Sequence, residues 1–247
     1  MSHAYGALFY DYIERGARAS ARRVVPLILG QLRVVSVLDV GCGRGAWLAE
    51  WMGAGVDEAF GIDGAHVDPA LLEIPRARFR ALDVGRPFDL GRRFDIVQCL
   101  EVAEHLPAAD ARTLVENLVR HGAVVLFSAA VPGQGGESHV NERPLSFWRS
   151  LFHASGYVPF DCVRAALRGQ GSVEPWYRYN TILYVSATVE KELPAAIRVH
   201  RVDDSLPFRN LAPWSWRLRC AALRLLPQAA ITRLAVLKHR AIARSRR

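Results

Sequence analysis

The sequence of 247 residues predicts a doubly wound α/β fold, in which helices cover both faces of a mostly parallel sheet. Three observations support this class. Short runs rich in β-branched residues alternate with helical stretches along residues 34–156. These runs are apolar along their whole length, which is typical of strands buried on both faces. A glycine-rich loop follows the first run, where such a sheet opens its ligand crevice.

The expected elements follow in chain order. Residues 7–33 predict a helix that Pro26 breaks or restarts, because proline cannot donate the hydrogen bond of a helix interior. Strands are expected at 34–40, 58–63, 77–84, 94–100 and 123–131. The intervening helices are expected at 46–53, 108–121 and 144–156. Two more strands, within 157–164 and 180–189, form an antiparallel pair and complete a seven-stranded sheet whose last strand is antiparallel.

Charge and pattern divide the chain into a helical cap (1–33), a central α/β domain (34–190) and a basic helical tail (191–247). The net charge is +8, but the chain from Arg198 onward holds twelve Lys/Arg and only two acids, a net charge of +10. Residues 1–197 therefore carry −2. The basic character belongs to the tail and not to the central domain.

The four cysteines are far apart and form no CxxC pair, as expected of reduced thiols in a cytoplasm. The first twenty residues mix acids with aromatics and show no signal peptide. No stretch reaches the roughly 20 apolar residues of a membrane span. The sequence therefore predicts a cytoplasmic protein, with a tail suited to the inner face of the membrane.

A glycine loop, DVGCGRG, follows the first expected strand, and its Gly41 and Gly43 let the backbone approach a ligand closely. Asp63 ends the second strand, where it can accept hydrogen bonds from ribose hydroxyls, and Asp83 ends the third, where it can accept from an adenine amino group. Asp39 disfavours a pyrophosphate but suits a cationic amino-acid ligand. The loop also lacks the G-x-G-x-x-G spacing of dinucleotide sites. S-adenosylmethionine, which carries no phosphate, has all the required features.

Four segments, VLDVGCGRG, GIDG, ALDV and FDIVQCLEVAEHL, resemble in order and spacing the motifs of class I S-adenosylmethionine-dependent methyltransferases. The resemblance covers roughly residues 30–187 and implies a Rossmann-like fold. It implies that the glycines line the methionine moiety, that Asp63 holds the ribose, and that Asp39 pairs with the cofactor or orients the loop amides. The implied cofactor-binding residues are Asp39, Gly41, Gly43, Asp63, Gly64, Asp83, Val84 and Leu100.

A second constellation begins in EVAEH, after the fourth strand. Glu101, Glu104 and His105 stand at positions i, i+3 and i+4, so one helical turn would place them on one face. His139 lies in the glycine-rich loop VPGQGGESHVNERP, which returns it to the same end of the sheet. Two carboxylates and two imidazoles that converge in this way can bind a divalent metal.

This constellation resembles the metal site of small-RNA 3′-terminal 2′-O-methyltransferases and of ubiquinone-biosynthesis O-methyltransferases. The resemblance implies a divalent metal bound by Glu101, Glu104, His105 and His139, which chelates two neighbouring hydroxyls and lowers the pKa of one of them. Mg²⁺ or Mn²⁺ is expected, and the mixed ligand set would also suit Fe²⁺ or Zn²⁺. Glu104, His105 and His139 are then the catalytic residues. Two alternatives stay open: His105 or His139 acts as a metal-free general base, or the cluster is only structural.

The acceptor that we expect is a hydroxyl on a small polyhydroxylated molecule, such as a sugar, a glycan or a natural product. An RNA 2′-O-methyltransferase and a non-catalytic scaffold of the same fold are the alternatives. The intact acids at three strand ends disfavour the scaffold. Aromatic residues near the first helix and before the last strand are expected to shape the acceptor pocket: Tyr5, Phe9, Tyr10, Trp176, Tyr177 and Tyr179.

The tail predicts two amphipathic helices separated by Pro227. Trp214, Leu218 and Leu225 recur on one face, with arginines on the others. Such helices suit an anionic membrane surface, or the phosphates of RNA or of a lipid-linked acceptor. The alternative is a helical pair that packs on its own domain or on the partner of a homodimer.

Overall fold

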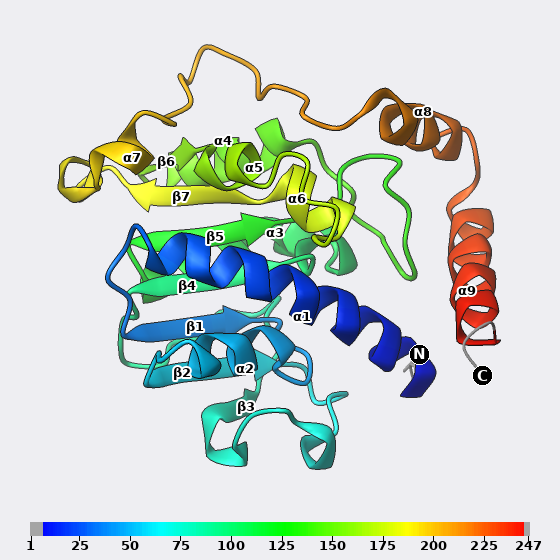
Figure 1. The fold of residues 1–247 in the computed structure, drawn as a ribbon, viewed down its shortest axis with the longest axis horizontal. Coiled ribbons are helices and arrows are strands. Elements are labelled where there is room, and N and C mark those ends of the chain that lie inside the picture. The colour runs from blue at the N-terminus through cyan, green and yellow to red at the C-terminus, as the bar shows by residue number, and fades with distance from the viewer. Residues whose placement is uncertain (1–6, 245–247) are drawn as a thin grey trace.

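A computed structural model describes the backbone of residues 7–244 and the side chains of residues 14–227 and 229–237. Its strands are β1 (Ser36–Val40), β2 (Glu58–Asp63), β3 (Phe79–Ala81), β4 (Ile96–Leu100), β5 (Val124–Ser128), β6 (Tyr157–Phe160) and β7 (Ile182–Ser186). Within the described chain they form one sheet in the order β3-β2-β1-β4-β5-β7-β6 (Figure 1). Strand β7 is antiparallel to β5 and β6, and the other pairs are parallel. The predicted fold class, with its antiparallel last strand, is confirmed.

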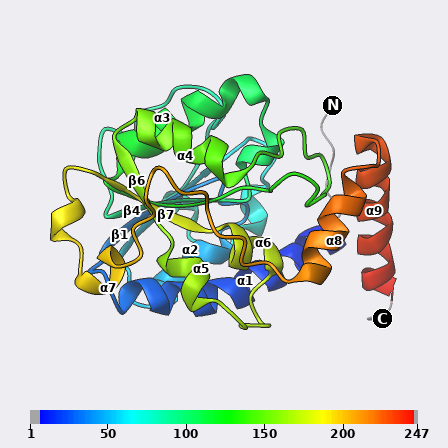
Figure 2. The ribbon, with the colours of Figure 1, turned by 90° about the horizontal axis from the view of Figure 1, so that it is seen from above.

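Helices cover both faces of the sheet. They are α1 (Ala7–Leu29), α2 (Ala46–Gly53), α3 (Ala111–His121), α4 (Leu145–Ala154), α5 (Cys162–Ala166), α6 (Pro175–Asn180), α7 (Ala195–Arg198), α8 (Trp214–Leu223) and α9 (Gln228–Arg244). Helices α3 and α4 lie on one face, and α1, α2 and α5 lie on the other (Figure 2). This is the doubly wound arrangement that the alternating sequence pattern predicts.

Burial from both sides explains why the strands are apolar throughout. Every residue of β1 and of β4 is buried. On one face of the sheet the core includes Val24 of α1 and Trp51 of α2, and on the other it includes Trp148 and Phe152 of α4. Burying a large apolar side chain stabilises the fold by roughly 1.5–3 kcal/mol. The packed sheet therefore gives the loops at its carboxyl edge a fixed base.

The prediction that Pro26 interrupts the first helix is wrong. Helix α1 continues through Pro26 and ends at Leu29. A proline in the last turn removes a single backbone hydrogen bond. Its neighbours Val24, Val25 and Ile28 are buried against the sheet, and their burial offsets that loss.

The tail forms the two helices that the sequence predicts, α8 and α9, on either side of Pro227. They stand on the side toward which the parallel strands point (Figure 1). Helix α9 lies beside α1, and α8 contacts the loop of residues 131–144 between β5 and α4. None of the helices within residues 7–244 is both long and apolar enough to cross a membrane.

Candidate active site

The glycine loop begins directly after β1 and is shaped by the space around it. Gly41 has φ 82°, a left-handed conformation, and a Cβ there would overlap the side chain of Val102. Gly43 has φ 55°, but a Cβ on it would meet no described atom within 4 Å. The loop is therefore packed from behind at Gly41 and faces open volume at Gly43, as a ligand-binding loop requires.

Asp63, at the end of β2, fixes this loop through backbone amides. The Gly43 amide donates to Asp63 Oδ2 over 2.7 Å, and the Gly64 amide donates to Oδ1 over 2.6 Å. The residue that orients the amide of Gly43 is thus Asp63, a role that sequence analysis offered to Asp39. The Asp63 side chain keeps 14% of its surface exposed at the carboxyl edge, where a ribose is expected.

Asp39 is buried in the middle of the sheet, with 3% of its surface exposed. It lies on β1 opposite Gln98 of β4, and Gln98 Oε1 accepts a hydrogen bond of 2.9 Å from Trp51 Nε1. Burial raises the pKa of Asp39 to about 8; the side chain of Gln98 lowers it and the charge of Asp63 adds to the rise. Without a cation beside it, Asp39 is therefore mostly neutral near pH 7.

The adenine-side residues lie beyond a strand that is shorter than predicted. Strand β3 ends at Ala81, so Asp83 stands in the following loop with 68% of its side chain exposed. Its Oδ1 accepts from the Gly85 amide over 3.0 Å. Val84 and Leu100, in contrast, are buried, and Leu100 ends β4. Asp83 thus offers a polar edge next to the apolar Val84, as expected of residues that flank an adenine ring, whereas Leu100 is expected near the carboxylate end of the cofactor.

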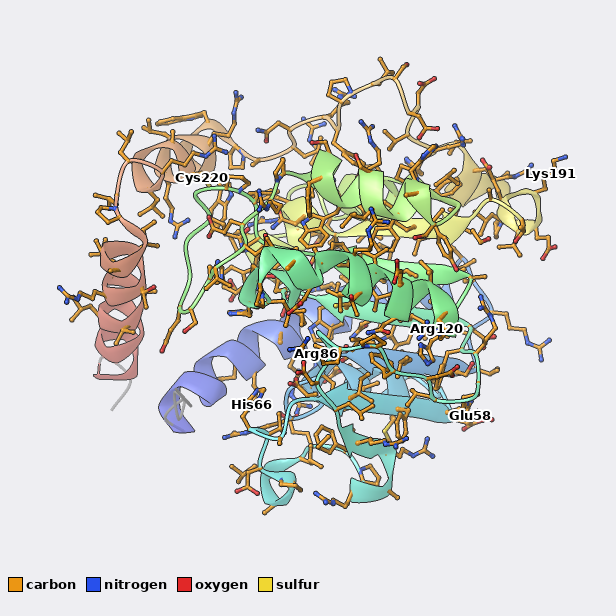
Figure 3. The ribbon with its side chains drawn as sticks, turned by 180° about the vertical axis from the view of Figure 1, so that it is seen from behind. Glu58, His66, Arg86, Arg120, Lys191 and Cys220 are labelled. Atoms are coloured by element: carbon orange, nitrogen blue, oxygen red, sulfur yellow. The ribbon has the colours of Figure 1, made fainter. Side chains whose placement is uncertain are left out.

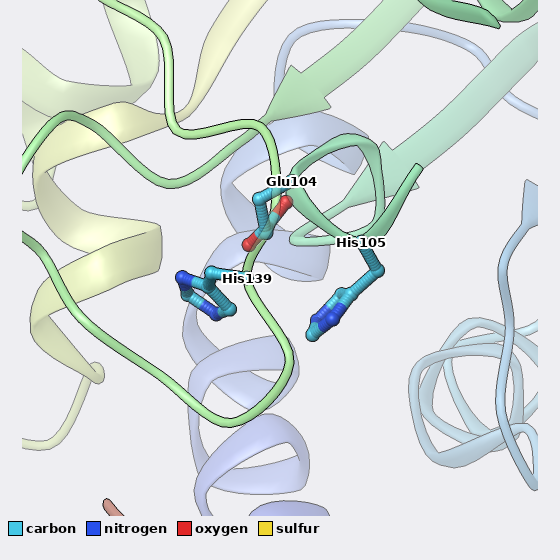
Figure 4. Close-up of side chains that lie close together, drawn as sticks. All are labelled: Glu104, His105 and His139. Carbon is cyan, nitrogen blue, oxygen red and sulfur yellow. The ribbon is translucent and has the colours of Figure 1, made fainter. Parts of the chain in front are cut away.

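Glu104, His105 and His139 converge beyond the ends of β4 and β5 (Figure 4). Each offers a ligand atom, and these atoms all lie within 4.8 Å of one another. Glu104 and His105 belong to a 3-10 turn, Ala103–His105, directly after β4. The loop that carries His139 is tied to this turn, because the amides of Val140 and Asn141 donate to the Glu104 carbonyl over 2.8 and 3.0 Å.

Glu104 is completely buried, and neither of its carboxylate oxygens has a hydrogen-bond partner within the described part of the chain. Burial and the neighbouring carboxylate of Glu101 raise its pKa well above the usual range. An unpaired buried carboxylate costs several kcal/mol unless it takes up a proton or contacts a cation. The chemistry of this position therefore fits a cation-binding role.

The two histidines differ in surroundings. The His139 ring is buried, and its Nδ1 lies 2.9 Å from Glu142 Oε1. The amides of Gly133 and Gly135 also donate to Glu142, each over 2.7 Å. Although burial opposes ionisation, these contacts keep the pKa of Glu142 below its usual range. Glu142 is therefore a carboxylate that accepts Nδ1–H, which places the lone pair of the neutral His139 ring on Nε2.

His105 is exposed at the mouth of the site, edge-on to His139 with 5.0 Å between ring centroids. Although part of the ring reaches solvent, protein atoms packed around it partly remove its hydration. This desolvation and the imidazole of His139 lower the pKa of His105 to about 4. His105 is consequently neutral near pH 7 and has a lone pair free for a metal, whereas a pKa this low makes it a weak proton acceptor.

Glu101 stands beside this cluster and not within it. Its backbone has φ 57°. Its Oε2 accepts a hydrogen bond of 2.7 Å from Nε2 of Gln134, and Oε1 of Gln134 accepts one of 2.7 Å from Nδ2 of Asn180. The single helical turn predicted for residues 101–105 does not form, since only Ala103–His105 is helical. A left-handed non-glycine residue costs roughly 1–2 kcal/mol. Such strain at the end of a central strand is typical of functional sites.

Sequence analysis did not identify Glu142, Gln134 or Asn180. The signal for Glu142 was its spacing, three residues after His139 in the same loop. Of the expected pocket aromatics, Tyr177 is buried and packs edge-on against Trp47, 5.1 Å between centroids. Tyr179 contacts Trp216 of α8. The expectations for Tyr5, Phe9 and Tyr10 concern side chains outside the described residues.

The comparisons with known proteins agree with this geometry. Residues 7–165 match a family described as "Methyltransferase domain", well over half of the chain. The protein belongs to this family and is an S-adenosylmethionine-dependent methyltransferase. Its cofactor is S-adenosyl-L-methionine. No curated protein sequence matches the chain.

Solved structures of methyltransferases share the fold. A sugar N-methyltransferase from Streptoalloteichus sp. aligns with a TM-score of 0.51 and 21% identity, over 75% of this chain and 97% of its own. The magnesium protoporphyrin IX methyltransferase of Synechocystis, with bound cofactor, aligns with a TM-score of 0.50 and 18% identity, over 76% and 87%. An amino pentose methyltransferase from Micromonospora echinaspora aligns with a TM-score of 0.41 and 29% identity, over 52% of this chain. The alignment spans only 58% of the length of that enzyme.

Proposed function

We propose that the protein methylates a hydroxyl group on a small polyhydroxylated acceptor, with the help of a divalent metal. The observation that carries this proposal is the buried carboxylate of Glu104, whose oxygens have no protein partner and which lies within ligand distance of His105 and His139. A hydroxyl is a poor nucleophile until its proton is removed, whereas an amine needs little help. A site that collects carboxylate and imidazole ligands therefore favours an oxygen acceptor.

The residues present fit a divalent metal, with Glu104, His105 and His139 as its ligands and Glu101 beside them. Two imidazoles with a carboxylate suit Mn²⁺, Fe²⁺ or Zn²⁺ better than Mg²⁺, which prefers oxygen ligands. When bound, such a metal lowers the pKa of a hydroxyl and orients its oxygen. S-adenosylmethionine supplies the methyl group on a sulfonium. Two neighbouring hydroxyls would occupy two positions around one metal, which is why we expect a diol.

The remaining work falls to the side chains of this protein. Asp63 and Gly43 hold the cofactor side of the crevice, and Asp39 favours a positive group there. Glu142 fixes the tautomer and the orientation of His139. The loop of His139 is bonded to the Glu104 carbonyl, so the two segments of the acceptor side are held together directly after β4. Fixed placement of donor and acceptor is the main contribution that methyl transfer requires.

A metal-free mechanism is the second candidate. The observation in its favour is that the imidazole of His105 is exposed at the mouth of the site. In this version His105 accepts the hydroxyl proton directly. The acceptor could equally be the 3′-terminal diol of an RNA, since the chemistry at the site would be the same.

Chelation separates these possibilities. The enzyme is dialysed against EDTA, and methyl transfer from labelled S-adenosylmethionine to a panel of sugars, amino sugars, diols and short RNAs is measured before and after Mn²⁺ is restored. We expect activity toward a vicinal diol that is lost and then recovered, and a loss of at least about tenfold when one of the two hydroxyls is absent. Full activity in EDTA would instead favour the metal-free mechanism, in which His105 accepts the proton of the acceptor hydroxyl. Methylation confined to amines would reject the oxygen acceptor, and methylation confined to RNA would reject the small acceptor.

A further inference from the structure

Helix α8 has an inner face that contacts the loop of residues 131–144, which carries His139. Arg219 Nη1 donates 2.7 Å to the Gln134 carbonyl, and Arg224 Nε donates 2.9 Å to the Pro132 carbonyl. Cys220, labelled in Figure 3, is buried on this side, where a Cβ on Gly133 would overlap its carbonyl oxygen. These contacts fix the position of α8 relative to the loop that carries His139.

The opposite side of the two helices is apolar and exposed. Trp214 and Leu218 lie one turn apart on α8, with 75% and 62% of their surfaces exposed. Among the described side chains, eleven large hydrophobic residues are exposed, and six of them fall within residues 214–237 of the tail. We call these six the outer face: Trp214, Leu218, Leu225, Leu226, Leu234 and Leu237. Scattered exposed leucines are ordinary, but a cluster of this kind indicates an interaction surface.

The segment that carries the outer face has charges of one sign. Residues 205–247 contain ten Lys/Arg and no Asp or Glu. Arg217 and Arg233 are exposed on the same helices as the outer-face leucines. Cations beside exposed Trp and Leu are the pattern of helices that lie in an anionic membrane interface.

Other partners explain only part of this pattern. RNA phosphates would use the arginines but leave the leucines exposed to water. A second copy of the chain would cover the leucines, but a two-fold dimer through this face would oppose two copies of residues 205–247, which carry ten Lys/Arg and no acid. Only an anionic lipid surface accommodates both the apolar side chains and the uncompensated positive charge.

We propose that the outer face docks on an anionic membrane surface. Trp214, Leu218 and Leu225 enter the interface and the arginines pair with lipid headgroups. The inner face then holds the loop of His139 about one helix diameter, roughly 10 Å, from the lipid. The docking does not depend on the proposed O-methylation, and it is measured without turnover.

The test is flotation of the full-length protein with vesicles of phosphatidylcholine alone or mixed with phosphatidylglycerol, at low and high salt. We expect binding to the mixed vesicles that weakens at high salt. Replacing three outer-face residues together (W214S, L218S and L225S) should lower vesicle partitioning by at least about tenfold. The matched control replaces three exposed apolar residues elsewhere (L71S, V199S and L206S) and should bind as the wild type does. Both variants should bind S-adenosylhomocysteine normally, which verifies that they are folded.

Three results would overturn the proposal. The first is equal binding of wild type and outer-face variant to the mixed vesicles. The second is a wild-type dimer in solution that the outer-face substitutions convert to a monomer, because the second copy would then be the occupant. The third is RNA binding that depends on the same three residues while vesicle binding is absent.

Discussion

At the carboxyl edge of the sheet, the cofactor side and the acceptor side differ in how their carboxylates are hydrogen-bonded. On the cofactor side, both oxygens of Asp63 accept backbone N–H groups, and the loop they hold is built from glycines. On the acceptor side, both oxygens of the buried Glu104 lack such partners. A carboxylate whose oxygens accept two backbone amides holds the cofactor loop in one position. A buried carboxylate left without donors is held ready for a cation, and it is there that this protein's particular chemistry should reside.

The most direct way to break this comparison is E104Q. The amide keeps the shape of the side chain but is a weak metal ligand, so we expect methyl transfer to fall about a thousandfold. Binding of Mn²⁺, followed by electron paramagnetic resonance, should disappear. The affinity for S-adenosylhomocysteine, measured by calorimetry, should stay within about twofold, because the cofactor side is unchanged. The control is E116Q on the exposed face of α3, which should change neither quantity. A large loss of cofactor affinity in E104Q would show that the halves are not independent.

The mirror experiment alters the cofactor side with G41A. The new Cβ would overlap Val102 and the backbone has φ 82°, so we expect cofactor affinity to fall about a hundredfold. The double variant with V102A removes the overlap and should recover part of the affinity. The φ strain would keep it below that of the wild type. Titration calorimetry of the four proteins gives the coupling energy. Additive losses would mean that Val102 is not what excludes a side chain at position 41.

E142Q tests whether His139 is positioned from outside the cluster. The neutral amide no longer favours a donated Nδ1–H on the imidazole, so metal affinity and turnover should each fall by about 10–100-fold. A merely structural role would lower the melting temperature and leave the metal affinity of the folded protein unchanged. The conservative variant E142D, which keeps the charge, should recover more activity than E142Q.

The smallest effect concerns the pH dependence of cofactor binding. The folded-state pKa of Asp39 is raised to about 8, above its ordinary value, so the neutral carboxyl dominates below that pH. A cationic cofactor favours the ionised form. Affinity should therefore rise with pH, by at most about tenfold per unit, and level off near pH 8. Calorimetry in two buffers should detect proton release on binding, and D39N should remove both effects. The exposed control, D57N, should keep the wild-type profile.

Sequence reasoning reached the cofactor half more completely than the acceptor half. Helix Ala46–Gly53 and strand Glu58–Asp63 lie where the hydrophobic pattern placed them, because local periodicity and burial agree in a doubly wound sheet. The contact of Asp63 with Gly43 could not be foreseen, since residues twenty apart meet only after the strands pair. In the acceptor half, Glu104, His105 and His139 come together as predicted, and Glu101 lies beside them with its carboxylate near that of Glu104, but not in the helical turn that was predicted for it. Its left-handed backbone is set by tertiary contacts that no local pattern encodes.

The hydrogen bonds between α8 and the loop of residues 131–144 have an evolutionary consequence. Arg219 and Arg224 grip the loop through the carbonyls of Gln134 and Pro132, and every residue has a carbonyl. Side chains along the loop can therefore change without loosening the hold. These hydrogen bonds thus permit the acceptor preference of an enzyme of this kind to diversify by point substitution while the loop backbone keeps its position.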